Sequence, residues 1–160
     1  MNRSRSRVGA AAAAIGFVLV AGCGGGQPAA DDSPEGRAFQ YRHAVMTIVG
    51  QKMLTLGGIA RGEISADDAA FTKAATDLAV MAGMTTEAFT SQGIPSGSRA
   101  LPAIWESWSD FERRAQDFQQ AAQAVAEAAQ RGGLEAARDL VRPLQQTCGG
   151  CHSTYRKPEE

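Results

Sequence analysis

The sequence predicts an all-α protein folded as an antiparallel four-helix bundle. Aromatic residues make up only 6% of its 160 residues. Alanine, the strongest helix former, is abundant, and runs of the β-branched residues typical of strands are few. Apolar residues also recur at spacings of three and four in four segments, which is the pattern of amphipathic helices. Four such segments joined mostly by short turns are typical of a bundle.

An export signal is predicted for residues 1–22. Arg3, Arg5 and Arg7 precede an uncharged run rich in Ala and Val, which combines the charged and apolar parts of a signal peptide. The run is shorter and less apolar than the roughly 20 residues that a membrane-spanning helix needs. Its last residues and the next one read VAGC and resemble a bacterial lipobox, so Cys23 is expected to carry lipid. A plain secretory signal, with Cys23 removed or left as a spare thiol, is the alternative.

The segment that follows is expected to be a flexible tether. Residues 23–34 contain the cysteine and then a stretch rich in Gly, Pro and Asp, so residues 35–157 are left as one domain of ordinary size. Loss of the three signal-peptide arginines would leave 13 basic against 17 acidic residues, a net charge of about −4. This mildly acidic balance, with no basic cluster, excludes nucleic acid as an expected partner.

The first two helices are predicted over residues 35–60 and from Ser65 to about Gly83. Arg61 and Gly62 should stop the first, and the second should begin with a Ser65 cap paired with Asp68. The first helix places these residues on one face: Phe39, Arg42, His43, Met46, Val49, Met53 and Leu56.

A long connection is expected over residues 84–99, where Gly, Ser, Thr and Pro predominate without a helical period. Connections of this length often wrap a ligand or one end of a bundle. The third helix is predicted to run from Ala100 to Gln130, with Pro102 in its first turn. Gly132 and Gly133 supply its stop.

The fourth helix is predicted from Leu134 to about Tyr155. Pro143 lies inside it, removes one backbone hydrogen bond and should kink the chain. The kink would either tilt the end of this helix or be absorbed as a mild bend.

The C-terminal end of that helix carries the motif Cys148-Gly149-Gly150-Cys151-His152, which is the C-x-x-C-H attachment motif of c-type haem. Two thiols one helical turn apart can form thioethers to the two haem vinyl groups, and the adjacent imidazole can then bind the iron. A redox disulfide, half of a zinc site and a structural disulfide are the competing interpretations. Zinc would need further ligands that the chain hardly supplies, and no α/β pattern accompanies the pair. The sequence therefore predicts one covalent c-type haem near the C-terminal helix.

The position of the motif in the last helix resembles the class II cytochromes c, the cytochrome c′ family. The matching stretches are YRHAVM at residues 41–46, PAIW at residues 102–105 and CGGCHSTYR at residues 148–156. The resemblance covers nearly all of the predicted domain. It implies a homodimer formed through the N-terminal helices.

The same resemblance implies roles for four further residues. Arg42 would lie near a haem propionate, with an exposed helix charge as the alternative. Arg156 would lie on the His152 side of the haem, or else act as a solvated cation at the helix end. Trp105 would be core or pocket wall. Met46 would face the open side of the iron.

Met46 separates two functions. If its thioether is the sixth ligand, the iron is closed and electron transfer is the function. If Met46 only packs over the iron, neutral gases such as NO and CO can bind, and the protein is a gas-binding or NO-scavenging protein. His43, one turn earlier, is a third candidate ligand, although a surface or pocket-edge histidine is the commoner case.

We expect an electron-transfer haem protein that also binds NO or CO, located on the periplasmic side and anchored by lipid on Cys23. A redox partner protein is expected to exchange electrons with the haem. A haem-free structural bundle, in which Cys148 and Cys151 form a disulfide, is the hypothesis from another class. No enzyme is expected, since no Ser/His/Asp set is present and both histidines are assigned.

Overall fold

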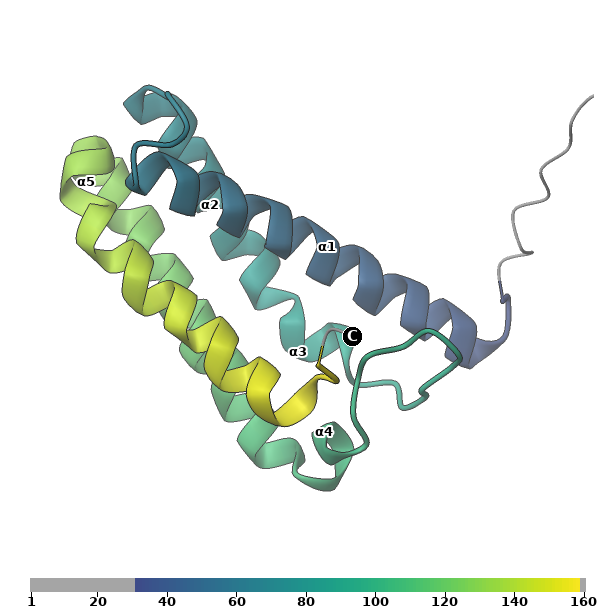
Figure 1. The fold of residues 1–160 in the computed structure, drawn as a ribbon. Coiled ribbons are helices and arrows are strands. Elements are labelled where there is room, and N and C mark those ends of the chain that lie inside the picture. Colours follow the sequence, from purple (N-terminus) through teal and green to yellow (C-terminus); the bar gives the residue numbers. More distant parts are fainter. Residues whose placement is uncertain (1–30, 159–160) are drawn as a thin grey trace, which may run out of the picture.

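The computed structural model describes residues 31–158 as an antiparallel four-helix bundle (Figure 1). The helices, in chain order, are α1 (Pro34–Ala60), α2 (Asp68–Gly83), α3 (Thr85–Ala88), α4 (Ala103–Glu106) and α5 (Trp108–Tyr155). The backbone of α5 leaves helical geometry at Gly132 (φ −160°, ψ 30°) and Gly133 (φ 62°, ψ −153°). Its two halves therefore run side by side in opposite directions, and with α1 and α2 they form the bundle. The predicted fold class is confirmed.

The limits of α1 follow from local signals and agree with the prediction within one residue. The Ser33 hydroxyl accepts a hydrogen bond from the Gly36 amide at 3.0 Å, and Pro34 occupies the first helical position, where its missing N–H costs nothing. At the other end, Gly62 adopts a positive φ of 77°, which glycine tolerates without strain. The chain turns there toward α2.

The start of α2 corrects the prediction of a Ser65 cap. Asp67 is the N-cap, and its carboxylate accepts a hydrogen bond from the Ala70 amide at 2.8 Å. Ser65 lies outside the helix and is exposed. Both Asp and Ser are good caps, so residue type alone does not choose between Asp67 and Ser65. Asp67 is the cap because its side chain reaches the free amide of Ala70 in the first turn of α2. The end of α2 at Gly83 is confirmed.

The third bundle helix begins later than predicted. The backbone is extended at Ala100, which forms an antiparallel bridge with Arg156, and the Leu101 amide donates to the Tyr155 carbonyl at 3.0 Å. Because these residues pair with the C-terminal segment, they cannot start a helix. The short α4 follows, and Ser107 (φ −124°, ψ 46°) separates it from α5. A further short helix, α3, lies within the expected connection.

Pro143 leaves the helix intact. Within α5 the residues with non-helical backbone angles are Gly132 and Gly133, so the helix continues through the proline without a break. Pro143 lies on an exposed position of the second half.

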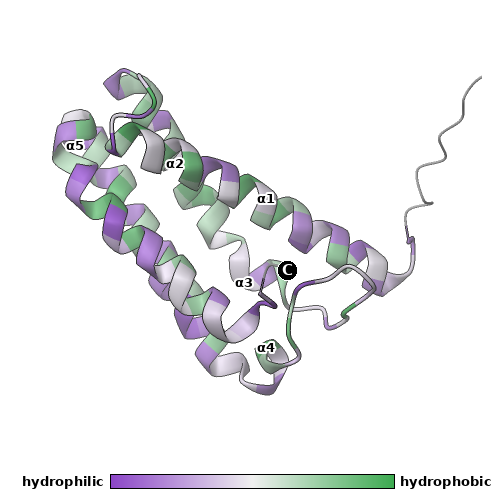
Figure 2. Ribbon diagram, in the orientation of Figure 1, coloured by the Kyte–Doolittle hydropathy of each residue, from purple (hydrophilic) through white to green (hydrophobic). Residues whose placement is uncertain are grey.

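Two groups of buried side chains fill the bundle. The main core is formed by α1, α2 and both halves of α5, and its fully buried members include Leu56, Phe71, Leu78, Val125 and Leu144. The aromatic cluster lies at the end where α4 joins α5 and consists of Ile104, Phe111 and Tyr155 with the partly buried Phe89, Ala100, Ala103, Trp105, Trp108 and Cys151. Hydrophilic and hydrophobic residues alternate along α5, as Figure 2 shows. Within residues 31–158, no helix is both long and apolar enough to cross a membrane.

Candidate functional site

The two motif cysteines lie on the inward side of α5 at the boundary between the two buried groups. Cys148 packs against the main core, and Cys151 packs against the aromatic cluster. Both are half-buried free thiols. They continue the buried face of the helix, since Leu144 precedes them by one turn and Tyr155 follows them by one turn. The pair is therefore held at the inner surface of the bundle and not in a surface loop.

Burial keeps both thiols protonated near neutral pH. Desolvation raises the pKa of Cys148, opposed by a hydrogen bond from Thr147. Desolvation also raises the pKa of Cys151, opposed by the positive charge of Arg114. Among the described residues, no group of three or more His, Cys, Asp or Glu side chains is placed to hold a metal ion.

His152 lies on the exposed side of the helix next to the cysteine pair. Its carbonyl accepts a hydrogen bond from the Arg156 amide at 3.1 Å, which closes the last turn of α5. Arg156 itself is half-buried, leaves helical geometry (φ −127°, ψ 135°) and pairs through its backbone with Ala100. Arg156, which the resemblance places on the His152 side of the haem, is thus held at the C-terminal end of α5.

Arg42 is buried, with 3% of its surface exposed. Its guanidinium donates to the carbonyls of Ser91 (2.8 Å) and Gly93 (2.5 Å). The rings of Phe89 and Trp105 lie 5.6 and 5.3 Å from its central carbon. Burial lowers the pKa of Arg42, and no carboxylate among the described residues forms an ion pair with it. The alternative of an exposed helix charge is therefore wrong.

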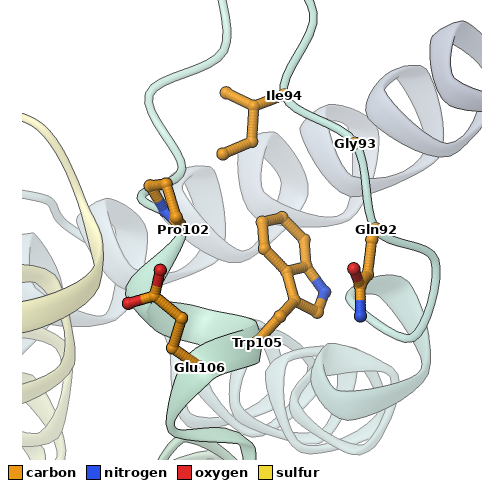
Figure 3. A pocket seen from close by; sticks show the side chains of 6 residues that line it. All are labelled: Gln92, Gly93, Ile94, Pro102, Trp105 and Glu106. Carbon is orange, nitrogen blue, oxygen red and sulfur yellow. The ribbon is translucent and has the colours of Figure 1, made fainter.

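Trp105 is both core and pocket wall. Its indole nitrogen donates to the Phe89 carbonyl at 2.8 Å, and its ring packs against the aromatic cluster. It also lines an open pocket of about 350 Å³, shown in Figure 3. The other lining residues are Gln92, Gly93, Ile94, Pro102 and Glu106. The connection predicted to wrap a ligand thus forms one wall of a pocket and binds Arg42 through its carbonyls.

Met46 lies on α1 and is half-buried at the edge of the main core, as is Cys148. His43 is exposed, and its ring lies 5.8 Å from that of Phe39 on the same helix. Met46 and Cys148 both pack against the main core, whereas His43 is exposed.

A polar cluster beside the motif was missed by sequence reasoning. The Asp110 carboxylate accepts hydrogen bonds from Tyr155 (2.7 Å), Arg113 (2.6 Å) and Arg114 (2.6 Å). These bonds, the one from Tyr155 foremost, hold the pKa of Asp110 well below its usual range. The spacing of Asp110 to Arg113 and Arg114 is a recognisable helical ion-pair pattern. The tyrosine partner lies 45 residues away and has no sequence signal.

Cys23 and the predicted signal peptide lie outside the described residues, as does most of the predicted tether. The bundle begins with α1 at Pro34 and its last helix ends at Tyr155.

Comparisons with known proteins agree on one family. The family model described as Cytochrome C′ matches residues 37–156. Cytochrome c-554 from Cereibacter sphaeroides is 34% identical over 127 residues, covering 77% of this chain and 82% of the relative. Cytochrome c′ from Halomonas halodenitrificans is 33% identical over 125 residues, covering 74% and 95%.

Solved structures give the same result. Cytochrome c prime from Shewanella frigidimarina superposes with a TM-score of 0.73 at 25% identity, covering 79% of this chain and 98% of that one. A nitric oxide complex of a cytochrome c prime variant from Alcaligenes xylosoxidans superposes with a TM-score of 0.67 at 26% identity, covering 76% and 94%.

Proposed function

This chain belongs to the cytochrome c′ family, and from that premise we propose that it is an exported electron-transfer protein whose iron also binds nitric oxide or carbon monoxide. As a member of this family it carries covalently attached haem c. Such a haem supplies an iron that changes oxidation state by one electron and offers a site for a neutral diatomic gas.

The donor set of the chain fits this group. Cys148 and Cys151 would form the thioethers, and His152 would be the axial ligand of the iron. The observation that carries this assignment is the state of the two thiols, which are free, half-buried and on one inward face, each against a different part of the core. A disulfide-bonded structural bundle would instead join the two sulfur atoms to each other.

Arg42 supports the assignment independently. A buried guanidinium that is bound only to carbonyls carries a positive charge in a poorly solvated environment. Burial of such a charge destabilises the folded protein unless an anion lies nearby. The carboxylates of the haem propionates would supply that anion, and Arg42 can donate to them through the hydrogens that Ser91 and Gly93 do not use. Arg156 and Trp105 are assigned to the same pocket, Arg156 on the His152 side and Trp105 as wall.

Met46 is assigned to the opposite side of the iron from His152. Its half-buried position against the main core, which Cys148 also contacts, supports this assignment. A thioether bound to iron would close the site to gases and favour electron transfer alone. A thioether that only packs there leaves the iron open to neutral gases while the apolar surroundings disfavour anions. The nitric oxide complex of the cytochrome c prime variant from Alcaligenes xylosoxidans supports the second arrangement.

The ferric absorption spectrum of the purified protein tests the proposal. We expect a high-spin spectrum that changes on addition of nitric oxide, together with reversible one-electron reduction. The Met46→Leu variant should keep that spectrum, because leucine preserves the apolar volume and removes the sulfur. A low-spin spectrum with a far-red sulfur-to-iron band, lost in Met46→Leu, would contradict gas binding. A colourless protein would contradict the whole assignment.

Export, lipid attachment at Cys23 and a homodimer complete the proposal. The arginine-rich start and the VAGC segment support export to the periplasmic side and anchoring by lipid. Large apolar side chains exposed on α1 support a homodimer through the N-terminal helices, namely Tyr41, Ile48 and Leu54. The protein is proposed to be a carrier and not an enzyme, with an unidentified protein as redox partner.

A further inference from the structure

The haem-attachment segment is tied to the first half of α5 on both sides of Cys151 and His152. Before them, the Gly150 carbonyl accepts a hydrogen bond from Arg114 Nη1 at 2.5 Å. After them, the Tyr155 hydroxyl donates to Asp110 Oδ2 at 2.7 Å. Both partners lie on the neighbouring antiparallel helix, so side chains of one helix hold the last turns of another.

One carboxylate connects the two attachments. Arg114 Nε donates to Asp110 Oδ2 at 2.6 Å, the same oxygen that accepts the Tyr155 hydroxyl. Arg113 donates to Oδ1 at 2.6 Å. The arginine that reaches Gly150 is thus oriented by Asp110, and the tyrosine is bound by it directly. Loss of this carboxylate would release both attachments together.

The tyrosine is a rigid member of this arrangement. Only 4% of the surface of Tyr155 is exposed. Its ring packs edge-on against Phe111, with centroids 5.5 Å apart, and the Arg114 guanidinium lies 5.7 Å from its centre. Its hydroxyl is therefore aimed at Asp110 by packing, and the bond to a charged acceptor is of the stronger kind.

Helix ends ordinarily fray, because their last carbonyls lack partners within the helix. The backbone bonds from Leu101 to Tyr155 and between Lys157 and Arg99 hold the chain after the motif. In the turn that contains Gly150, Cys151 and His152, the Gly150 carbonyl accepts the bond from Arg114 and also one from the nearby Ser153 hydroxyl at 3.1 Å. Of these two bonds, the one from Arg114 ties the turn to the first half of α5. That support sets where the ligand residues lie relative to the rest of the bundle.

We propose that Asp110 is a positioning residue for haem ligation, which through Tyr155 and Arg114 fixes the orientation of the Cys151–His152 turn. The proposal rests on the proposed function. Because the orientation of an axial ligand tunes the electronic properties of the iron, the network contributes to the reduction potential of the protein and not only to its stability.

Two variants that conserve charge test this in the full-length haem-loaded protein. Tyr155→Phe keeps the packed ring and removes only the hydroxyl. Arg114→Lys keeps the positive charge, but its single ammonium cannot reach both Asp110 and Gly150. Arg131→Lys is the matched control, since Arg131 is an exposed arginine of the same helix whose side chain pairs with Glu127 and not with Asp110, Tyr155 or Gly150. The measurements are hydrogen exchange of amides 150–155 and the midpoint reduction potential.

We expect amides 150–155 to exchange at least about tenfold faster in both variants, since each loses a hydrogen bond to or from a charged group. The midpoint potential should shift in both, while Arg131→Lys matches the wild type in both measurements. The double variant should shift the potential by less than the sum of the single shifts, since both attachments pass through Asp110. In Asp110→Asn, amides 150–155 should also exchange faster, and the midpoint potential should shift as well.

Three results would overturn the proposal. Faster exchange with an unchanged potential would make the network a structural support only. Unchanged exchange in Tyr155→Phe and Arg114→Lys would show that the turn is held without them. A potential that moves in Asp110→Asn but in neither charge-conserving variant would assign the effect to charge. Failure of the proposed function is distinct, because it would be seen in the wild type as absence of covalent haem or of reversible reduction, and it would remove this inference too.

Discussion

The Asp68 carboxylate accepts a hydrogen bond at 2.8 Å from the backbone amide of Leu134, a residue 66 positions away. Asp68 belongs to the first turn of α2, and Leu134 begins the second half of α5 immediately after the turn at Gly133. One side chain therefore caps the helix that ends in the haem motif. The glycine turn and its cap together determine where that helix begins.

The cap predicts a measurable loss of stability. Asp68→Ala should lower the free energy of unfolding by about 1 kcal/mol, the usual cost of losing a helix cap. Urea denaturation followed by circular dichroism measures it. Asp139→Ala, at an exposed position on the same half of α5, is the control and should change stability by less than about 0.5 kcal/mol. Equal stabilities of the two variants would contradict the capping role.

The motif cysteines predict the fate of the haem. In a Cys148→Ala/Cys151→Ala variant, the denatured chain should have the mass of the polypeptide alone, because neither thioether can form. Mass spectrometry under denaturing conditions measures this directly. Wild type and a Cys23→Ser variant should both retain the mass of the haem. Covalent haem in the double variant would refute the assignment.

Cys23 predicts where the protein is found. If this cysteine is lipidated, the wild type should fractionate with membranes. Cys23→Ser should move to the soluble periplasmic fraction with its haem spectrum unchanged, because the bundle begins after the tether. Immunoblots of the separated fractions test it. If the wild type is itself found in the soluble periplasmic fraction, the signal is a plain secretory one and Cys23 carries no lipid.

Asp110 predicts a dependence of stability on pH. Its pKa is lower in the folded protein than the ordinary value of 3.8, through bonds from Tyr155, Arg113 and Arg114. The folded state therefore binds the proton less readily, so the stabilisation is complete above about pH 5 and is lost as the pH falls through 4 and below. The stability difference between wild type and Asp110→Asn should be largest near pH 7 and should shrink on acidification. Urea titrations at pH 7, 5 and 3.5 measure it, and a difference that grows toward low pH would contradict the sign.

The exposed apolar residues of α1 predict the assembly state. Ile48 and Leu54 are 42% and 66% exposed, and burial of such side chains between two copies would favour association. Ile48→Glu/Leu54→Glu should therefore shift the protein from dimer to monomer in light scattering coupled to size exclusion. Gln123→Glu on α5 adds one negative charge elsewhere and should leave the dimer intact. A monomeric wild type would refute the homodimer.

Local sequence signals determined much of the architecture. The spacing of apolar residues located α1 within one residue of its limits, and the Gly132-Gly133 pair marked the turn between the halves of α5. The C-x-x-C-H motif indicated the cofactor, since its chemistry depends on five consecutive residues. Helical periods, stops and such motifs are encoded over a few neighbouring positions, which is why they can be read without a structure.

Tertiary structure decided the rest. The late start of the third bundle helix depends on pairing of Ala100 with Arg156, and the burial of Arg42 depends on carbonyls about 50 residues away. The bond between Asp110 and Tyr155 likewise joins two antiparallel helices. A single sequence specifies which residue types can make such contacts. Only the packing of the helices, which brings distant side chains within hydrogen-bonding distance, determines which of them do.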